Sequence, residues 1–223
     1  MRVSAVILAR VIWFLEVVDL NPRGTVFYPN IVRALVERYG FQKSPQKVED
    51  FDETKGVTFE QGTTNQLNID KLVIYTDGIQ LDTASSTEDS DRILEEALRW
   101  ATQSLGLKFN ADMVKRKAYV SQFTFYSDAP ILQIHPVLQS ISAKVGETVS
   151  ENLRLPSLFE PIGILWGLDP EAQRMPVFSF SIERRQGKPF SEGKYFSAAP
   201  LPTDTHMGLV EEFEKTALQQ KRH

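Results

Sequence analysis

The sequence predicts an α+β fold: a mostly antiparallel sheet with helices packed on one face. Strand-like and helix-like segments do not alternate strictly, as they would in a parallel α/β sheet. Asp77-Gly78 lies between two segments of alternating apolar residues, which is typical of an antiparallel hairpin. Phe178, Phe180 and Ile182 alternate with polar residues, so one face of the sheet is expected to meet water.

The first predicted elements are a strand and a helix. Val11–Leu20 is rich in β-branched and aromatic residues, and the turn residues Asn21-Pro22-Arg23-Gly24 follow it. A helix is indicated by apolar residues four positions apart, Ile31, Leu35 and Tyr39. Gly40 is typical of the end of such a helix.

The hairpin and a second helix come next. The hairpin spans Asn68–Thr83, with Asp77-Gly78 favouring a type I′ turn, and Thr58–Thr64 predicts a strand before it. Ser85 and Glu88 have the spacing of a capping box. The helix that follows carries an apolar stripe that includes Leu98, and Gly106 ends it.

The second half of the sequence predicts three strands and two helices. The strands are Ala118–Tyr126, Phe159–Leu168 and Val177–Ile182, and Gln186–Pro202 is a loop. A long helix over Ile131–Asn152 carries an apolar stripe that should cover the sheet. The last helix begins near Thr203 and should bury Leu209, Phe213 and Ala217.

Length and composition predict a single domain over residues 1–223, with a frayed tail at 219–223. Two strand–helix–strand halves would fit an old duplication. The chain has no cysteine, which removes disulfide and thiolate chemistry and fits a reducing, cytoplasmic location. The apolar N-terminal run is interrupted by Arg10, Glu16 and Asp19, so no membrane span is expected.

Two stretches of the sequence resemble a known family in their layout. One is YTDGIQLDTASSTEDSDRILEEALRWATQSLGLKF with the strand AYVSQFTFYSD, and the other is PVFSFSIERRQGKPF followed, after a polar loop, by TDTHMGLVEEFEKTAL. Their order is similar to that of a sporadically distributed family of uncharacterised bacterial proteins. The resemblance covers most of the chain and implies no activity.

The sequence contains no phosphate-binding glycine loop and no nucleophile elbow, so no cofactor or catalytic residue is predicted. The enzyme alternative depends on Asp204 and His206, where a carboxylate could orient an imidazole. The competing interpretation is that Thr203, Asp204 or Thr205 caps a helix and leaves His206 on its first turn. The acidic segment from Glu49 to Glu53 has no calcium-loop spacing, so no metal site is predicted.

Two basic clusters offer a nucleic-acid alternative. They are Lys115, Arg116 and Lys117, and Arg184, Arg185 and Lys188. Tyr119, Phe123 and Phe125 could stack on bases near them. The net charge of −4 argues against a dedicated binder of polyanions, so nucleic acid is not the expected partner.

The remaining hypothesis is a non-enzymatic protein-interaction or assembly protein. It follows from ordinary charge, the lack of a site motif and regular patterning throughout. The expected partner is a protein. A weak homodimer would use a sheet edge or the Ile131–Val145 stripe.

Overall fold

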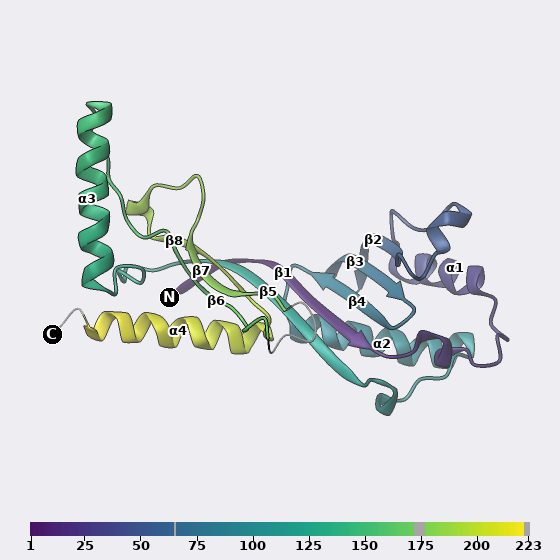
Figure 1. Ribbon diagram of the computed structural model, residues 1–223. Helices are drawn as coiled ribbons and strands as arrows, with labels where there is room; N and C mark the ends of the chain where they lie inside the picture. The colour runs from purple at the N-terminus through teal and green to yellow at the C-terminus, as the bar shows by residue number, and fades with distance from the viewer. Residues whose placement is uncertain (65, 172–176, 221–223) are drawn as a thin grey trace. The chain divides into compact units, whose positions relative to one another are not determined.

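The computed structural model describes residues 1–64, 66–171 and 177–220. The described residues form four α-helices and eight antiparallel strands in the order β2-β3-β4-β1-β5-β8-β7-β6 (Figure 1), which confirms the α+β class. The described chain divides into two compact units. We call Val6–Gln122 with Pro200–Thr203 the N-terminal unit, and Met1–Ala5, Phe123–Ala199 and Asp204–His223 the C-terminal unit.

The same order of elements occurs twice along the chain: a strand, a helix, three strands and a second helix. In the first half these are β1 (Arg2–Phe14), α1 (Tyr28–Tyr39), β2 (Val57–Thr64), β3 (Leu67–Tyr75), β4 (Gly78–Thr83) and α2 (Thr87–Leu105). In the second half they are β5 (Arg116–Tyr126), α3 (Pro136–Leu153), β6 (Gly163–Trp166), β7 (Phe180–Arg184), β8 (Lys194–Ala199) and α4 (Thr203–Gln220).

The strand order repeats together with the element order. The first half reads β2-β3-β4-β1, and the second half reads β6-β7-β8-β5. The strand–helix–strand halves suggested by the sequence correspond to β1-α1-β2 and β5-α3-β6. In this repeat α3 is the counterpart of α1, and β6 is the counterpart of β2.

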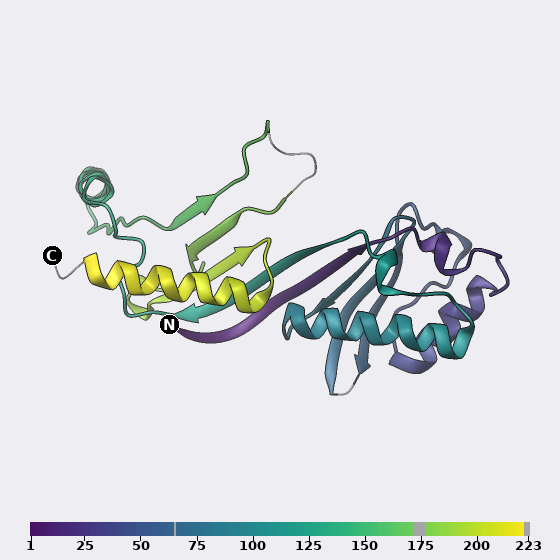
Figure 2. The same ribbon diagram turned by 90° about the horizontal axis from the view of Figure 1, so that it is seen from below.

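The core of the N-terminal unit lies between the strands and the helices α1 and α2, and Figure 2 shows α2 running along the strands. Leu35 and Tyr39 from α1, Phe59 and Leu72 from the sheet, and Leu98 from α2 are all buried there. The predicted burial of Leu98 is therefore confirmed. The predicted helix ends at Gly40 and Gly106 are also confirmed, because both glycines are left-handed.

The β3–β4 hairpin is present, but the predicted turn is wrong. Tyr75 pairs with Gly78, so the two loop residues are Thr76 and Asp77, and neither has a positive φ. On its other side Gly78 pairs with Phe14 of β1. A Cβ atom on Gly78 would lie 2.7 Å from the carbonyl oxygen of Trp13. This glycine is required by the close approach of two strands and not by the turn.

Other element boundaries differ from those predicted. The N-cap of α2 is Ser86, whose side chain accepts from the Asp89 amide, one residue later than the predicted box. The strand β1 ends at Phe14, and a 3₁₀ turn occupies Val17–Leu20. The predicted loop after Gln186 contains the strand β8, which sequence analysis missed.

The predicted tail lies partly within a helix. α4 continues through Gln219 and Gln220, and residues 221–223 lie outside the described residues.

We expect Gly78→Ala to lower the free energy of unfolding by about 1–3 kcal/mol, because β1 and β4 would have to separate to admit the methyl group. Gly208→Ala is the matched control. Gly208 is exposed in α4 and has open space beside it, so alanine should raise stability by about 0.5–1 kcal/mol through its helix propensity. Urea unfolding of both variants checks this. If the two substitutions changed stability equally, Gly78 would not be required by the close approach of β1 and β4.

Candidate functional site

The helix α3 is defined by local signals at both ends. His135 is its N-cap, and the His135 Nδ1 atom accepts a hydrogen bond from the Val137 amide at 3.2 Å. Pro136 occupies the first helical position, where no amide is needed. The helix ends at Arg154, which is left-handed. The predicted start at Ile131 was five residues early, because Ile131 and Leu132 are buried in the segment before the helix.

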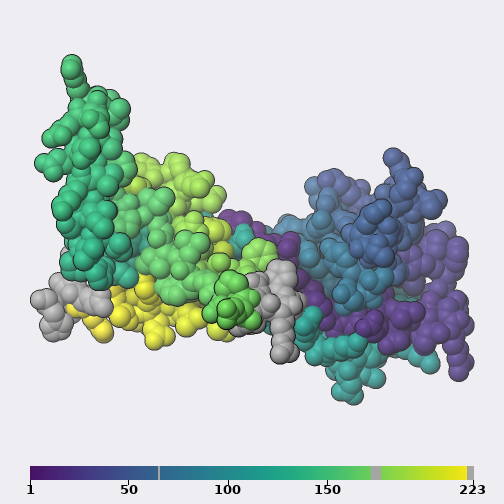
Figure 3. Space-filling model, in the orientation of Figure 1, coloured from purple at the N-terminus to yellow at the C-terminus, as the bar shows by residue number. Residues whose placement is uncertain are grey.

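The apolar stripe of α3 does not cover the sheet as the sequence predicted. Val137, Leu138, Ile141 and Val145 are all exposed, Ile141 by 53%. Gly146 is the one buried residue of the helix. Figure 3 shows much of the α3 surface uncovered in that view. An amphipathic helix depends mainly on packing of its apolar face, so a bare stripe on an 18-residue helix needs a partner surface.

The segment after α3 runs back along the last turns of the helix. The Ser157 amide donates to Ser150 Oγ at 2.8 Å, and the Ser150 hydroxyl donates to the Gly146 carbonyl at 2.6 Å. A Cβ on Gly146 would lie 2.9 Å from the Ser157 carbonyl oxygen, so the glycine permits this approach. The returning segment is therefore held against the Gly146 side of the helix.

Exposed apolar side chains concentrate in this region. Of the 22 large hydrophobic residues that are exposed among the described residues, 15 lie between Ile134 and Phe178. We define the α3–β6 surface as the exposed apolar residues of α3, the returning segment and β6: Val137, Leu138, Ile141, Val145, Leu153, Leu155, Leu158, Phe159, Ile162, Leu165 and Trp166. Exposed apolar side chains gathered in this way mark interaction sites more often than isolated ones do.

The corresponding elements of the N-terminal unit are covered. In α1 the residues Ile31, Val32, Leu35 and Tyr39 are buried, and in β2 Val57 and Phe59 are completely buried. In β6 Leu165 is 66% exposed and Trp166 is 40% exposed. The C-terminal unit thus has a helix, α3, with its apolar stripe exposed, and an edge strand, β6, that contacts α4 through Trp166 but leaves Leu165 exposed.

The basic cluster near β7 ties the returning segment to the sheet. Arg184 Nη2 donates to Glu160 at 2.6 Å, and Arg184 Nη1 donates to the Phe190 carbonyl at 3.0 Å. Its guanidinium also lies 4.9 Å from the Tyr195 ring centroid. Lys188 is within 3.7 Å of Glu192. Arg185 lies over the Phe196 ring at 5.9 Å.

The other basic cluster belongs to the N-terminal unit and is also engaged within it. Lys115 pairs with Glu16 at 2.7 Å, and Lys117 pairs with Asp91 at 2.7 Å. Arg116 lies over the Phe14 ring at 4.2 Å. Each predicted basic residue therefore has a structural contact in its own unit.

The aromatic residues of β5 are not available for stacking on bases. Phe123 and Phe125 are completely buried, and Tyr119 is partly buried against the core of the N-terminal unit. The suggestion that Phe123 and Phe125 stack on bases therefore has no support from their positions. Their alternation reflects packing.

His206 is a core residue of the C-terminal unit. It is fully buried, with its ring centroid 4.5 Å from that of Phe123 and 5.5 Å from that of Phe180. The His206 Nε2 atom lies 2.7 Å from Ser197 Oγ. The Ser197 hydroxyl donates to the Ser181 carbonyl at 2.6 Å, so its single proton is used and Nε2 must donate to Ser197. The imidazole therefore carries a proton on Nε2.

This geometry gives His206 no access to a substrate. Ser197 is fully buried as well, so the serine–histidine pair is closed to solvent. Asp204 is exposed, in contrast to the buried imidazole. Burial lowers the pKa of His206 to about 4. A base this weak and this enclosed suits packing better than acid–base catalysis.

The buried face of α4 differs from the predicted one. Thr203, His206, Val210, Glu214 and Ala217 are buried, whereas Leu209 is 41% exposed. The prediction gave the buried face to Leu209 because a histidine and a glutamate do not resemble core residues. Ala217 was placed correctly, and Phe213 is half-buried against Trp166.

Thr203 does not act as the simple helix cap that the sequence suggested. Its Oγ1 accepts from the Thr87 amide at 2.9 Å, and its own amide donates to Thr87 Oγ1 at 2.7 Å. Both threonines are buried. The first residues of α2 and α4, which correspond in the repeat, therefore satisfy each other's free amides.

Among the described residues, no three His, Cys, Asp or Glu side chains lie close enough together to hold a metal ion. In the acidic segment Asp50 accepts from the amides of Gln46 and Lys47, and these bonds lower its pKa. The cluster is thus explained by local turns. None of the described helices combines the length and the apolar character needed to cross a membrane.

Comparison with models of known protein families gave no match, and comparison with curated proteins gave no relative. The bacterial family that the sequence resembles therefore stays a prediction.

Because His206 is buried, we expect the stability of the folded protein to fall at acid pH. The unfolded chain binds a proton at this histidine near pH 6.5, whereas the folded protein keeps it neutral down to about pH 4. Acidification across this interval therefore favours the unfolded chain, by roughly 2 to 3 kcal/mol in total. We expect His206→Gln, which keeps a donor near Ser197, to remove this part of the pH dependence.

Denaturant unfolding between pH 7.5 and pH 4 measures the effect. His135→Gln, which changes an exposed histidine, is the control and should keep the wild-type loss of stability. A His206→Gln protein with an unchanged pH profile would show that burial of His206 is not the cause.

Proposed function

We propose that the protein is a cytoplasmic, non-enzymatic assembly protein that associates with a second copy of itself through the α3–β6 surface. The observation that carries the proposal is the bare apolar stripe of α3, together with the exposed side chain of Leu165 in β6. The cytoplasmic location is supported by the absence of cysteine. The proposed interface is stabilised by the burial of apolar side chains.

A second copy fits because the two uncovered surfaces belong together in the repeat. In the N-terminal unit the apolar face of α1 and the residues of β2 are buried in one core. The C-terminal unit has the same two elements, α3 and β6, with both exposed. If two copies exchange α3, each helix covers the other copy's sheet and each sheet gains its missing helix. Exchange of an identical element in this way gives a closed, two-fold dimer.

The enzyme and nucleic-acid alternatives have less support. The enzyme alternative needs an accessible His206, and its imidazole is enclosed between Phe123 and Phe180. The nucleic-acid alternative needs free cations. Lys115, Lys117, Arg184 and Lys188 are in ion pairs within their own units. The exposed apolar side chains favour a protein surface over both.

We expect Leu138→Glu and Ile141→Glu each to weaken self-association by more than tenfold without loss of folding. Both side chains are exposed, so a carboxylate there costs the separate chain little. In the dimer the same carboxylate would be buried without a partner, which costs several kcal/mol. Sedimentation velocity over a range of protein concentrations measures the association, and thermal melting checks the fold.

Ser140→Glu is the matched control, since it adds the same charge to an exposed position of α3 outside the stripe. It should associate like the wild type. Wild-type protein that stays monomeric at high concentration would reject the proposal, as would a dimer that Leu138→Glu and Ile141→Glu leave intact.

A further inference from the structure

The N-terminal unit contains a cavity between its helices and its sheet. The cavity has a volume of about 220 Å³. Its walls come from α1, α2, β3, β4 and the 3₁₀ turn after β1, and they are largely aliphatic, as with Leu20, Leu35, Leu72, Ile79, Leu94 and Leu98. A dry cavity of about 150 Å³ with such walls is large enough to bind benzene. This cavity therefore has room for a ring and a few further atoms.

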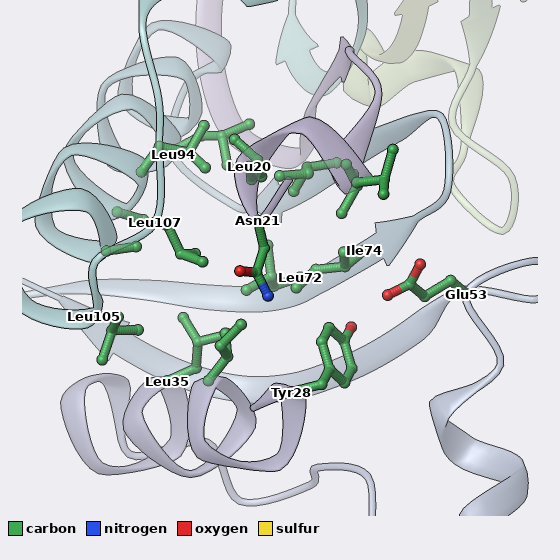
Figure 4. Close-up of a pocket in the computed structure, with 17 residues that line it drawn as sticks. Leu20, Asn21, Tyr28, Leu35, Glu53, Leu72, Ile74, Leu94, Leu105 and Leu107 are labelled. Carbon is green, nitrogen blue, oxygen red and sulfur yellow. The ribbon is translucent and has the colours of Figure 1, made fainter. Parts of the chain in front are cut away.

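One polar group in the wall has no protein partner. The Tyr28 hydroxyl oxygen is buried and makes no hydrogen bond to the described residues. Figure 4 shows Tyr28 rising from α1 with its hydroxyl directed toward the side of the cavity that Ile74 and Glu53 line. Buried hydroxyls are normally hydrogen-bonded, so an orphan hydroxyl in a cavity wall marks a position where a bound molecule can supply the missing partner.

The other polar groups of the wall limit which ligands the cavity can bind. The Asn21 amide is already satisfied, because it donates to the Val26 carbonyl at 2.8 Å and accepts from the Val26 amide. Burial, and secondly the negative charge of Glu53, raise the pKa of the Tyr28 hydroxyl above its usual range. The hydroxyl thus remains a proton donor, and Glu53 disfavours a bound anion near it.

We propose that this cavity is a binding site for a small neutral apolar molecule, of about the size of a substituted benzene, that carries one hydrogen-bond acceptor for the Tyr28 hydroxyl. The aliphatic walls bind the hydrocarbon part by excluding water. The single hydroxyl fixes its orientation, as a few placed polar groups do in apolar ligand sites. The site lies wholly in the N-terminal unit and does not depend on the proposed dimer.

Three probes of nearly equal shape test the proposal: acetophenone, which is a neutral acceptor, cumene, which has no acceptor, and benzoate, which is an anion. Binding to the full-length protein is measured at pH 8 by titration of amide chemical shifts. We expect acetophenone to bind at least tenfold more tightly than benzoate. In Tyr28→Phe the dissociation constant for acetophenone should rise about 3- to 10-fold, and the constant for cumene should not rise.

Ala101→Leu tests the location of the site. Ala101 is a buried cavity residue of α2, and the added side-chain atoms should fill space and weaken acetophenone and cumene together. Gln103→Leu makes the same kind of change at an exposed position of the same helix, outside the cavity wall, and should bind both probes as the wild type does. Circular dichroism and melting confirm that each variant is folded.

The proposal is overturned if neither neutral probe binds the wild type or if folded Ala101→Leu binds both as well as the wild type does. An equal loss of acetophenone and cumene binding in Tyr28→Phe would also overturn it, because the hydroxyl would then have no role as a donor. Benzoate that binds as tightly as acetophenone would reject the preference for neutral molecules.

Discussion

An antiparallel sheet of four strands presents an apolar face that has to be removed from water, and this need for cover governs both halves of the chain. In the first half α1 and α2 supply the cover, and residues such as Leu35, Phe59 and Leu98 form one core. Thr87 and Thr203 begin α2 and α4, which correspond in the repeat, and the amide of each donates a hydrogen bond to the side-chain hydroxyl of the other. Gly78 lets β1 and β4 approach closely enough for that sheet to form.

In the second half the same need is only partly met. α4 covers its side of the sheet with His206, Val210 and Ala217, and the closed hydrogen bonds of His206 with Ser197 allow an imidazole to serve as a core residue. α3 leaves its apolar stripe exposed. α1 and α3 occupy the same position in the repeat, but only α1 is covered. We therefore interpret the α3–β6 surface as an interaction surface. In the dimer that we propose, the exposed stripe of α3 in one copy would be covered by the sheet of the other copy.

Much of the fold could be predicted from the sequence because its signals are local. Gly40, Gly106, the hairpin and the apolar stripe of α2 each depend on neighbouring residues. The strand β8 was missed because its buried positions include Ser197 and Ala199, which do not look like an apolar face. The burial of His206 could not be predicted from the sequence because it depends on Phe123 and Phe180, both distant along the chain. The stripe of α3 was recognised, but a stripe specifies only that a face needs cover and not which molecule supplies it. The cavity beside Tyr28 has no local signal at all, since five separate elements form it.

The central claim is that α3 is covered by a second copy, and hydrogen–deuterium exchange of the α3 amides at several protein concentrations tests it most directly. A helix without tertiary packing opens readily, whereas a packed one is protected. Our account predicts that protection of Val137 to Leu153 rises with protein concentration, while the amides of α2 in the N-terminal unit stay equally protected throughout. Rapid exchange of α3 at every concentration would contradict the account, and so would strong protection that does not depend on concentration, since the helix would then be covered within its own chain.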